Sequence, residues 1–304
     1  MGSPLSGGAD LMIDVRQLRK KFGHTIALNG VDLQVRPGEI HAFLGPNGAG
    51  KTTTLRLLLG LLRADGGTMS VLGMDPWRDV AALHERLAYV PGDVALWPNL
   101  TGGEVIHMLG QLRGGVDQVL VDDMIARFEL DPTKKGRSYS KGNRQNVALI
   151  SALASDVDLY LLDEPTSGLD PLKEAVFRDC VRDLRDRGKA VLLSSHILSE
   201  AEAVSDRVSI IRHGAIVETG TLTQLRHLAR TSVRAQVRHV PAGLAQATGV
   251  HDLRIDGRQV SAQVDSGAMT GFMLLLAAAG IENLVSEPPT LEQMFLEHYQ
   301  DGAA

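Results

Sequence analysis

Apolar runs of strand length alternate with helical periodicities along the chain from residue 40 onward. The run 40–44 precedes a glycine-rich loop, and leucines then recur at helical spacing over 55–62. The runs 159–162 and 190–193 are short and continuous, which is typical of buried parallel strands, and 172–187 between them has a helical pattern. Strands and helices that alternate in this way predict an α/β fold.

Further periodic segments extend this predicted domain over residues 11–228. Residues 93–152 are mainly helical in pattern and are predicted to form a helical subdomain inserted into the α/β domain, with a helix at its end over 147–154. Short segments with strand alternation or helical spacing complete the domain. The expected strands are 12–15, 27–35, 89–90, 208–211 and 215–218, and the expected helices are 80–87 and 222–228.

A second set of strands and helices is predicted over residues 229–304. It contains no group of side chains suited to bind phosphate or metal or to act as a nucleophile, so we predict a small α/β domain with an interaction or regulatory role. Residues 1–10 are rich in Gly and Ser and are predicted to be a disordered lead or a cloning remnant. The expected elements of the second domain are strands 233–237, 253–255, 260–264 and 282–285 and helices 244–247, 269–279 and 291–299.

The composition is that of a globular protein and indicates no specific function. The 304 residues are 44% hydrophobic and 22% charged, as in ordinary globular proteins, and the net charge of −5 argues against a nucleic-acid partner. The single cysteine, Cys180, cannot form an internal disulfide and fits a reducing compartment. The longest apolar run, 272–279, is far too short to span a bilayer.

The segment from Gly45 to Thr52 has the spacing G-x-x-x-x-G-K-T and lies between a predicted strand and a predicted helix. This is the context of a phosphate-binding loop. Its glycines let backbone N–H groups converge on phosphate oxygens, Lys51 adds a positive charge, and Thr52 offers a hydroxyl to Mg²⁺. The alternatives are a plain glycine turn and a dinucleotide-binding loop, but the second needs another glycine order and no lysine. The predicted ATP contacts here are Gly45, Pro46, Asn47, Gly48, Ala49, Gly50, Lys51, Thr52 and Thr53.

Polar residues follow the predicted central strands. Asp163 and Glu164 stand at the carboxyl end of one strand, where open α/β sheets bind ligands. Because neighbours on a strand point to opposite faces, we expect Asp163 to bind Mg²⁺ through water and Glu164 to activate the attacking water. His196 follows the next strand and should reach a γ-phosphate at the same sheet edge. The simpler alternatives are a polar strand end and a structural histidine.

Two other segments each allow two interpretations. Phe22, beside Gly23, is either part of the core or a flat surface on which adenine stacks, and its position before the phosphate loop favours stacking. Ser140 and Gly142, just before a predicted helix, are either a simple N-cap or a second anion site at a helix N-terminus.

Together these motifs resemble the nucleotide-binding subunit of ATP-binding cassette (ABC) transporters over residues 12–228. The resemblance implies a P-loop NTPase fold of the ABC type that binds ATP and Mg²⁺. Phe22 matches the adenine-stacking position, and Gly45 to Thr52 match the Walker A motif. The strand that ends in Glu164 matches Walker B with its catalytic glutamate, and His196 matches the switch histidine.

Two segments depart from the family pattern. Tyr139 to Asn143 read Y-S-K-G-N where the family signature reads L-S-G-G-Q, so Ser140 and Gly142 are kept and Lys141 adds a charge. Gly92 stands where the family has a glutamine that touches Mg²⁺ and signals to the membrane subunit. Because glycine has no side chain to ligate a metal, we hypothesise that Asp93 or a water takes that place.

The resemblance also implies partners. Two copies would pair head to tail as a homodimer, with each ATP between the phosphate loop of one copy and the signature loop of the other. Both departures and the segments 96–101 and 289–296 are similar to the bacterial ABC-2-like exporter branch. The ATPases of that branch lie on the cytoplasmic side of the cell membrane and drive export of drugs, antibiotics or lipids through separate transmembrane permease subunits. The alternative is a soluble ABC ATPase without a membrane partner. The implied contacts with the partner copy's ATP are Ser140, Lys141, Gly142, Asn143 and Asp170.

Overall fold

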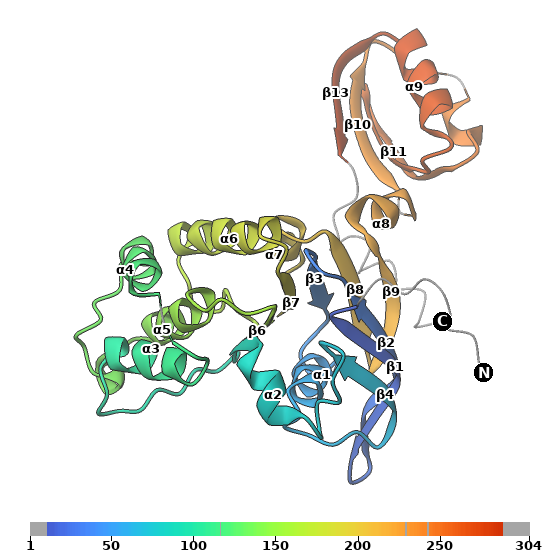
Figure 1. Ribbon diagram of the computed structural model, residues 1–304. Coiled ribbons are helices and arrows are strands. Elements are labelled where there is room, and N and C mark those ends of the chain that lie inside the picture. The colour runs from blue at the N-terminus through green and yellow to red at the C-terminus, as the bar shows by residue number, and fades with distance from the viewer. Residues whose placement is uncertain (1–10, 116, 229, 242, 288–304) are drawn as a thin grey trace. The chain divides into compact units, whose positions relative to one another are not determined.

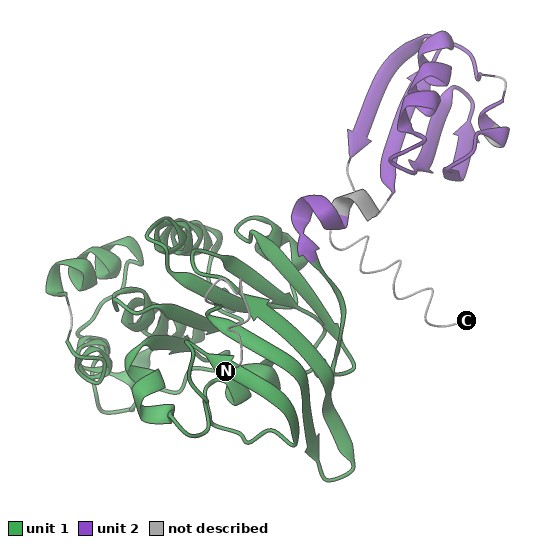
Figure 2. Ribbon diagram, turned by 45° about the vertical axis from the view of Figure 1, so that its right-hand side comes forward, with its two compact units in different colours: residues 1–219 green, residues 220–304 purple. Residues whose placement is uncertain are grey.

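The computed structural model describes residues 11–115, 117–228, 230–241 and 243–287. The chain divides into two compact units, the first ending at Thr219 and the second beginning at Gly220 (Figure 2). The boundary predicted from the sequence lies after residue 228, at the end of the helix α8 (Leu222–Leu228). In the structure α8 instead belongs to the second unit. None of the helices among the described residues is long and apolar enough to cross a bilayer.

A six-stranded sheet in the order β5-β6-β7-β3-β8-β9 is the centre of the first unit (Figure 1). The neighbours from β5 to β8 pair in parallel, so their carboxyl ends share one edge. Every residue of β3, β6 and β7 is buried, which explains why these strands are continuous apolar runs. The strands are β3 (Ile40–Leu44), β5 (Leu87–Val90), β6 (Leu159–Asp163), β7 (Ala190–Ser195), β8 (Arg207–Arg212) and β9 (Ala215–Thr221).

A separate antiparallel sheet has the order β2-β1-β4, with β1 at Ile13–Phe22, β2 at Thr25–Val35 and β4 at Gly66–Val71. The helix α1 (Lys51–Leu58) follows the phosphate loop, and one hydrophobic core joins it to both sheets, through Leu18, Phe43 and Leu55 among others. The strands β1 and β2 are longer than the sequence indicated. Phe22, expected between two strands, is the last residue of β1.

Three of the remaining helices of the first unit lie together, away from the antiparallel sheet. Figure 1 shows α3, α4 and α5 on the opposite side of this unit from the sheet β2-β1-β4. A capping box, formed by Thr101 and Glu104, begins α3. The predicted helix at 147–154 begins earlier, at Lys141, and the predicted helix 80–87 ends at Glu85 because Leu87 starts β5. The elements are α2 (Val80–Glu85), α3 (Gly102–Gln111), α4 (Gln118–Arg127), a 3₁₀ turn (Gly136–Ser138), α5 (Lys141–Leu153), α6 (Pro171–Asp186) and α7 (Leu198–Glu202).

The second unit is a four-stranded antiparallel sheet in the order β11-β12-β10-β13. Phe272 and Leu276 of α9 pack with Val233 and Val260 of the sheet in a core of their own. The predicted helix 291–299 lies outside the described residues. The elements are β10 (Thr231–Val237), a 3₁₀ turn (Leu244–Gln246), β11 (Val250–Asp256), β12 (Gln259–Val264), α9 (Met269–Ala278) and β13 (Ile281–Glu287).

Candidate functional site

A cavity of about 580 Å³ lies at the carboxyl edge of the six-stranded sheet. The phosphate loop, the acid pair and His196 all line it, although they come from segments far apart in the sequence. The predicted residues that line the cavity are Pro46, Asn47, Gly48, Gly50, Lys51, Thr52, Thr53, Asp93, Asp163, Glu164 and His196. The structure therefore brings the predicted phosphate and metal residues to one place.

The phosphate loop places the side chain of Lys51 in the wall of the cavity. Gly50 has a φ of 115°, which side-chain-bearing residues rarely adopt, and a Cβ there would lie 2.7 Å from Leu28 Cδ2. This glycine lets the loop turn directly into α1. The Lys51 ammonium donates to Gly45 O at 2.6 Å and lies 3.2 Å from Glu164 Oε1. The only strongly buried cation of the cavity lining is thus held by a carbonyl and by the second acid.

Asp163 is held by two hydroxyl groups. Thr52 Oγ1 donates to Asp163 Oδ2 at 2.8 Å, and Ser194 Oγ donates to Asp163 Oδ1 at 2.6 Å. A carboxylate beside a hydroxyl is a donor set that suits Mg²⁺, which takes one or two protein ligands in addition to phosphate oxygens and water. The two side chains expected to hold Mg²⁺ are therefore adjacent and of the right chemistry.

Glu164 points away from Asp163 because of its own backbone conformation, which the sequence did not predict. The strand β6 ends at Asp163, so strand alternation does not separate the two acids as expected. Glu164 instead has a left-handed φ of 48°, and its N–H donates to Ser194 Oγ at 3.1 Å. Its Oε2 lies 2.6 Å from His196 Nδ1, so the carboxylate sits between Lys51 and His196.

Phe22 is exposed and lies outside the residues that line the cavity. The Lys20 ammonium lies 5.4 Å from the centre of its ring, in cation–π contact. The ring is therefore not part of the core, and one of the two interpretations of this residue is excluded. The cavity wall nearest to this hairpin comes from Thr25, Ile26 and Ala27 of β2.

The signature loop packs against the loop that follows the acid pair. A Cβ on Gly142 would lie 2.5 Å from Gly168 O, so only glycine permits this approach. Lys141 Nζ donates to Ser167 Oγ at 3.1 Å. Ser140 is the N-cap of α5 and accepts a bond from Asn143 N, so the N-cap interpretation holds for the single chain.

Asp170 is the N-cap of α6. Its carboxylate accepts bonds from the backbone N–H and the ammonium of Lys173, which lowers its pKa. Asp170 and the signature residues Ser140 to Asn143 are absent from the cavity lining of their own chain. Their position fits a role toward a second copy, which stays a prediction.

Gly92 faces the acid pair without a side chain. A Cβ on Gly92 would lie 3.3 Å from Asp163 O and 3.6 Å from its carboxylate, so the backbone passes directly beside the proposed metal residue. Asp93, next along, is exposed and lines the same cavity. No contact joins Asp93 to Thr52 or Asp163 among the described side chains, so its proposed metal role stays a prediction.

Several residues of the site were not predicted from the sequence, among them Ser194, Tyr89 and Arg56. Ser194 bridges the two acids, and its only signal was a polar residue at the end of a buried strand. Tyr89 and Arg56 line the cavity. Burial, with the nearby Asp163 carboxylate, raises the pKa of Tyr89 to about 12, so this phenol stays protonated and can donate a hydrogen bond.

The comparisons with known proteins agree with this geometry. The family model of the ABC transporter matches residues 28–167. The daunorubicin resistance ATP-binding protein DrrA3 of Streptomyces coeruleorubidus is 36% identical, and the match covers 95% of this chain and 96% of that protein. The chain belongs to the ABC transporter family. The bacitracin transport ATP-binding protein BcrA of Enterococcus faecalis is 31% identical over 71% of each chain.

Solved structures confirm the predicted fold. An ATP-binding subunit of an ABC transporter has a TM-score of 0.67 and 28% identity, and the match covers 71% of this chain and 92% of that one. A dimeric ATP-binding cassette with bound ADP and phosphate has a TM-score of 0.63 at 23% identity, over 69% of this chain and 99% of that one. The predicted family, the P-loop fold of the ABC type and the ATPase activity are thus confirmed.

Proposed function

We propose that this ABC ATPase powers the efflux of drugs, antibiotics or lipids through separate transmembrane subunits. The observation that carries the proposal is the connected set of contacts from Lys51 through Glu164 to His196, beside the pair Thr52 and Asp163, in one cavity. These are the parts that phosphoryl transfer to water needs: a cation for the phosphates, a carboxylate for the water, and a group for the γ-phosphate.

The position of Lys51 links the phosphate loop to the proposed catalytic carboxylate. Its ammonium donates to Gly45 O and lies 3.2 Å from Glu164 Oε1. Triphosphate oxygens attract the ammonium more strongly than one partly exposed carboxylate does, since they carry more charge. With Lys51 paired to the phosphates, one oxygen of Glu164 would be available to orient a water, while His196 holds the other oxygen.

Magnesium fits the donor set of Thr52 and Asp163, where it would neutralise charge that develops on the phosphates. Asp163 is buried and fixed by Ser194, so its carboxylate is already oriented toward the side of the cavity where Thr52 lies. The proposed role of Asp93 is weaker, because its side chain is exposed and can swing toward this pair.

The second half of each site would come from a second copy. Ser140, Lys141 and Gly142 lie outside their own cavity, as expected if they meet the ATP of a partner. Because Gly142 and Gly168 are in close contact and Lys141 bonds Ser167, the signature loop would move together with the loop that carries Asp170. A homodimer with two shared ATP sites is therefore the proposed active form.

The proposed membrane role rests on the relatives. Their names describe daunorubicin resistance and bacitracin transport, which supports efflux of antibiotic-like compounds and a place on the cytoplasmic side of the bacterial membrane beside a permease. The alternative, a soluble ATPase without a membrane partner, has no support from these relatives.

Glu164→Gln tests the proposal directly. The amide keeps the size of the side chain but cannot accept the proton from water, so we expect ATP binding within a few-fold of the wild type and turnover reduced by at least about a hundred-fold. ATP binding is measured by equilibrium titration and turnover by phosphate release, with His213→Gln, a turn residue outside the cavity lining, as control. A variant that turns over at the wild-type rate removes Glu164 from this role.

A further inference from the structure

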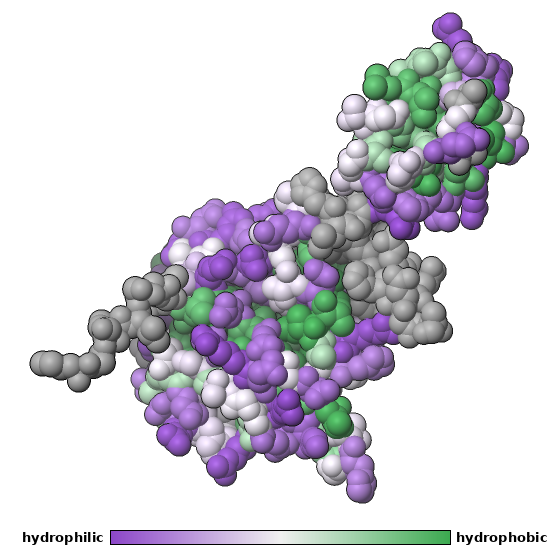
Figure 3. Space-filling model, turned by 90° about the vertical axis from the view of Figure 1, so that its right-hand side faces the viewer, coloured by the Kyte–Doolittle hydropathy of each residue, from purple (hydrophilic) through white to green (hydrophobic). Residues whose placement is uncertain are grey.

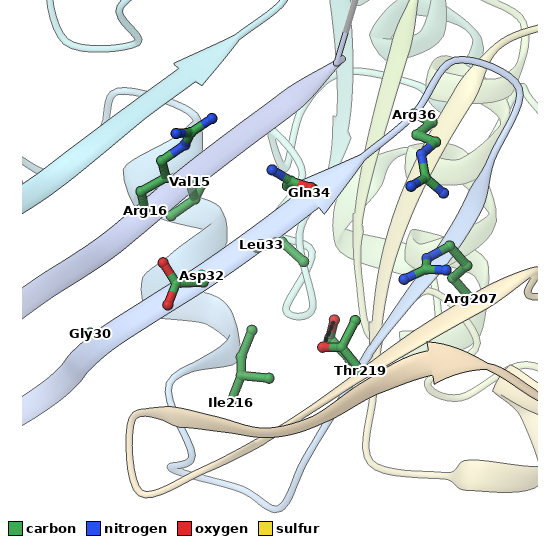
Figure 4. Close-up of a pocket in the computed structure, with 11 residues that line it drawn as sticks. Val15, Arg16, Gly30, Asp32, Leu33, Gln34, Arg36, Arg207, Ile216 and Thr219 are labelled. Atoms are coloured by element: carbon green, nitrogen blue, oxygen red, sulfur yellow. Dashed lines mark hydrogen bonds between the residues drawn. The ribbon is translucent and has the colours of Figure 1, made fainter. Parts of the chain in front are cut away.

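A second cavity, of about 490 Å³, lies away from the ATPase site, between the sheet β2-β1-β4 and the strands β8 and β9 (Figure 4). None of its lining residues lines the nucleotide cavity. Figure 3 shows hydrophobic residues, in green, gathered on one face of the first unit with hydrophilic residues around them. The cavity has the size of a small-molecule site and is not used by the mechanism above.

Two arginines from different elements define one end of this cavity. Figure 4 shows the Arg36 and Arg207 side chains at the same end, and both residues contact Glu39, Arg36 through its backbone N–H and Arg207 through its Nε at 3.8 Å. The Arg36 guanidinium has no ion pair or hydrogen bond with any described residue. The Arg207 side chain is 25% exposed, and its single carboxylate contact is long.

The other charged residues of the lining are already engaged. Arg16 bonds both oxygens of Asp14, which lowers the pKa of that carboxyl. Asp32 accepts bonds from the backbone and the side-chain amide of Gln17, at 2.8 and 2.6 Å. Among the charged side chains of the lining, those with the fewest contacts are therefore the cations at the end where Arg36 and Arg207 lie.

Part of the lining is apolar. Val15 and Leu33 are buried members of the main core, and Ile216 packs against that core from β9. We propose that this cavity binds an organic anion whose compact carboxylate or phosphate head pairs with Arg36 and Arg207 and whose apolar body lies against Leu33 and Ile216. Guanidinium groups suit such heads because they donate two parallel hydrogen bonds.

A bonded chain of polar side chains connects the arginine end to the strand before the phosphate loop. Thr219 Oγ1, which lines the cavity, lies 2.9 Å from Ser209 Oγ, and Ser209 Oγ lies 2.9 Å from His41 Nε2. His41 is fully buried in β3, and its Nδ1 lies 2.7 Å from Glu39 Oε1. Because β3 ends at Leu44, directly before Gly45, these hydrogen bonds link the cavity to the strand that precedes the phosphate loop.

Calorimetric titration of the full-length chain tests the site, with saturating Mg-ADP present so that the nucleotide cavity is not the place of binding. The probes are octyl phosphate, inorganic phosphate as the head alone, and octyl glucoside as a neutral head on the same body. We expect octyl phosphate to bind, inorganic phosphate to bind more weakly, and octyl glucoside not to bind. Arg36→Gln should weaken octyl phosphate binding at least about ten-fold, the loss of one charge-assisted contact.

Arg16→Gln is the matched control, because Arg16 lines the same cavity but its guanidinium is held by Asp14. We expect this variant to bind octyl phosphate within about two-fold of the wild type. Equal weakening in both variants, equal binding of octyl glucoside, or no binding of octyl phosphate would each overturn the proposal. Because Mg-ADP binding is measured separately, failure here is distinguishable from failure of the proposed ATPase role.

A second arm distinguishes a free metabolite from a lipid as the source of the anion. Vesicles of phosphatidylglycerol are compared with vesicles of phosphatidylcholine in a sedimentation assay. Sedimentation with the anionic vesicles that is lost in Arg36→Gln indicates a lipid headgroup. Binding of octyl phosphate without such sedimentation indicates a soluble anion. Both results support the site, whereas sedimentation that is unchanged in Arg36→Gln counts against it.

Discussion

Removal of the Ser194 hydroxyl should slow ATP hydrolysis although this residue does not line the nucleotide cavity. Ser194 is fully buried, and its Oγ both donates to Asp163 Oδ1 at 2.6 Å and accepts from Glu164 N at 3.1 Å. One hydroxyl therefore fixes the direction of the proposed metal carboxylate and of the backbone that aims the proposed catalytic carboxylate. In Ser194→Ala the bond to Asp163 is lost, and Glu164 N keeps only its contact with the backbone carbonyl of residue 194.

The size of the effect follows from these contacts. A hydrogen bond to a buried carboxylate contributes about 1.5–3 kcal/mol, and Asp163 would keep only its bond from Thr52. If this free energy is expressed in the transition state, turnover falls by about ten- to a hundred-fold. Glu164 N keeps a contact with Ser194 O at 3.2 Å, so the strand and its fold should persist. We expect the free energy of unfolding to fall by about 1–3 kcal/mol.

Three measurements distinguish a specific loss of turnover from a loss of ATP binding or of folding stability. Phosphate release gives turnover, titration gives ATP affinity, and urea unfolding gives stability. Ser195→Ala is the control, since Ser195 is equally buried but its hydroxyl bonds only with the backbone of Ile197. We expect a turnover defect in Ser194→Ala alone, with more Mg²⁺ needed for half-maximal rate and ATP affinity within a few-fold. Equal turnover in the two variants would refute the reasoning.

Three further predictions concern Gly142, Glu200 and Asp93. Gly142→Ala should reduce the free energy of unfolding by about 1–3 kcal/mol in urea, because its Cβ would lie 2.5 Å from Gly168 O, whereas the exposed Lys141→Gly should change it by less than about 1 kcal/mol. Burial raises the pKa of Glu200, so its stabilising contribution is present below its unfolded pKa and is lost as pH rises; Glu200→Gln should therefore be more stable than the wild type at pH 8, with a difference that disappears below about pH 4. Asp93→Ala should raise the Mg²⁺ concentration needed for ATP hydrolysis, and an unchanged requirement together with unchanged transport would end the hypothesis that Asp93 replaces the missing glutamine.

The sequence correctly predicted those parts of the site that depend on the order of residues within one short segment. An apolar run, a glycine loop and a leucine-spaced helix predicted the surroundings of Lys51, and the continuous runs predicted that β6 and β7 are buried. Parallel strands then place the residues after each strand at one edge, which correctly brought Glu164 and His196 together. Boundaries were less accurate, since Phe22 belongs to a strand and Lys141 already begins α5.

The different orientations of Asp163 and Glu164 depend on contacts with a residue that is distant in the sequence. Strand alternation would orient Asp163 and Glu164 only if both lay in β6, but the strand ends at Asp163 and Glu164 has a left-handed φ of 48°. That conformation is unfavourable for a residue with a side chain and persists where surrounding contacts support it. Ser194, thirty-one residues after Asp163, supplies such contacts to both acids. The opposite orientations therefore come from tertiary structure, and for that reason the hydroxyl of Ser194 should matter for a reaction that it does not touch.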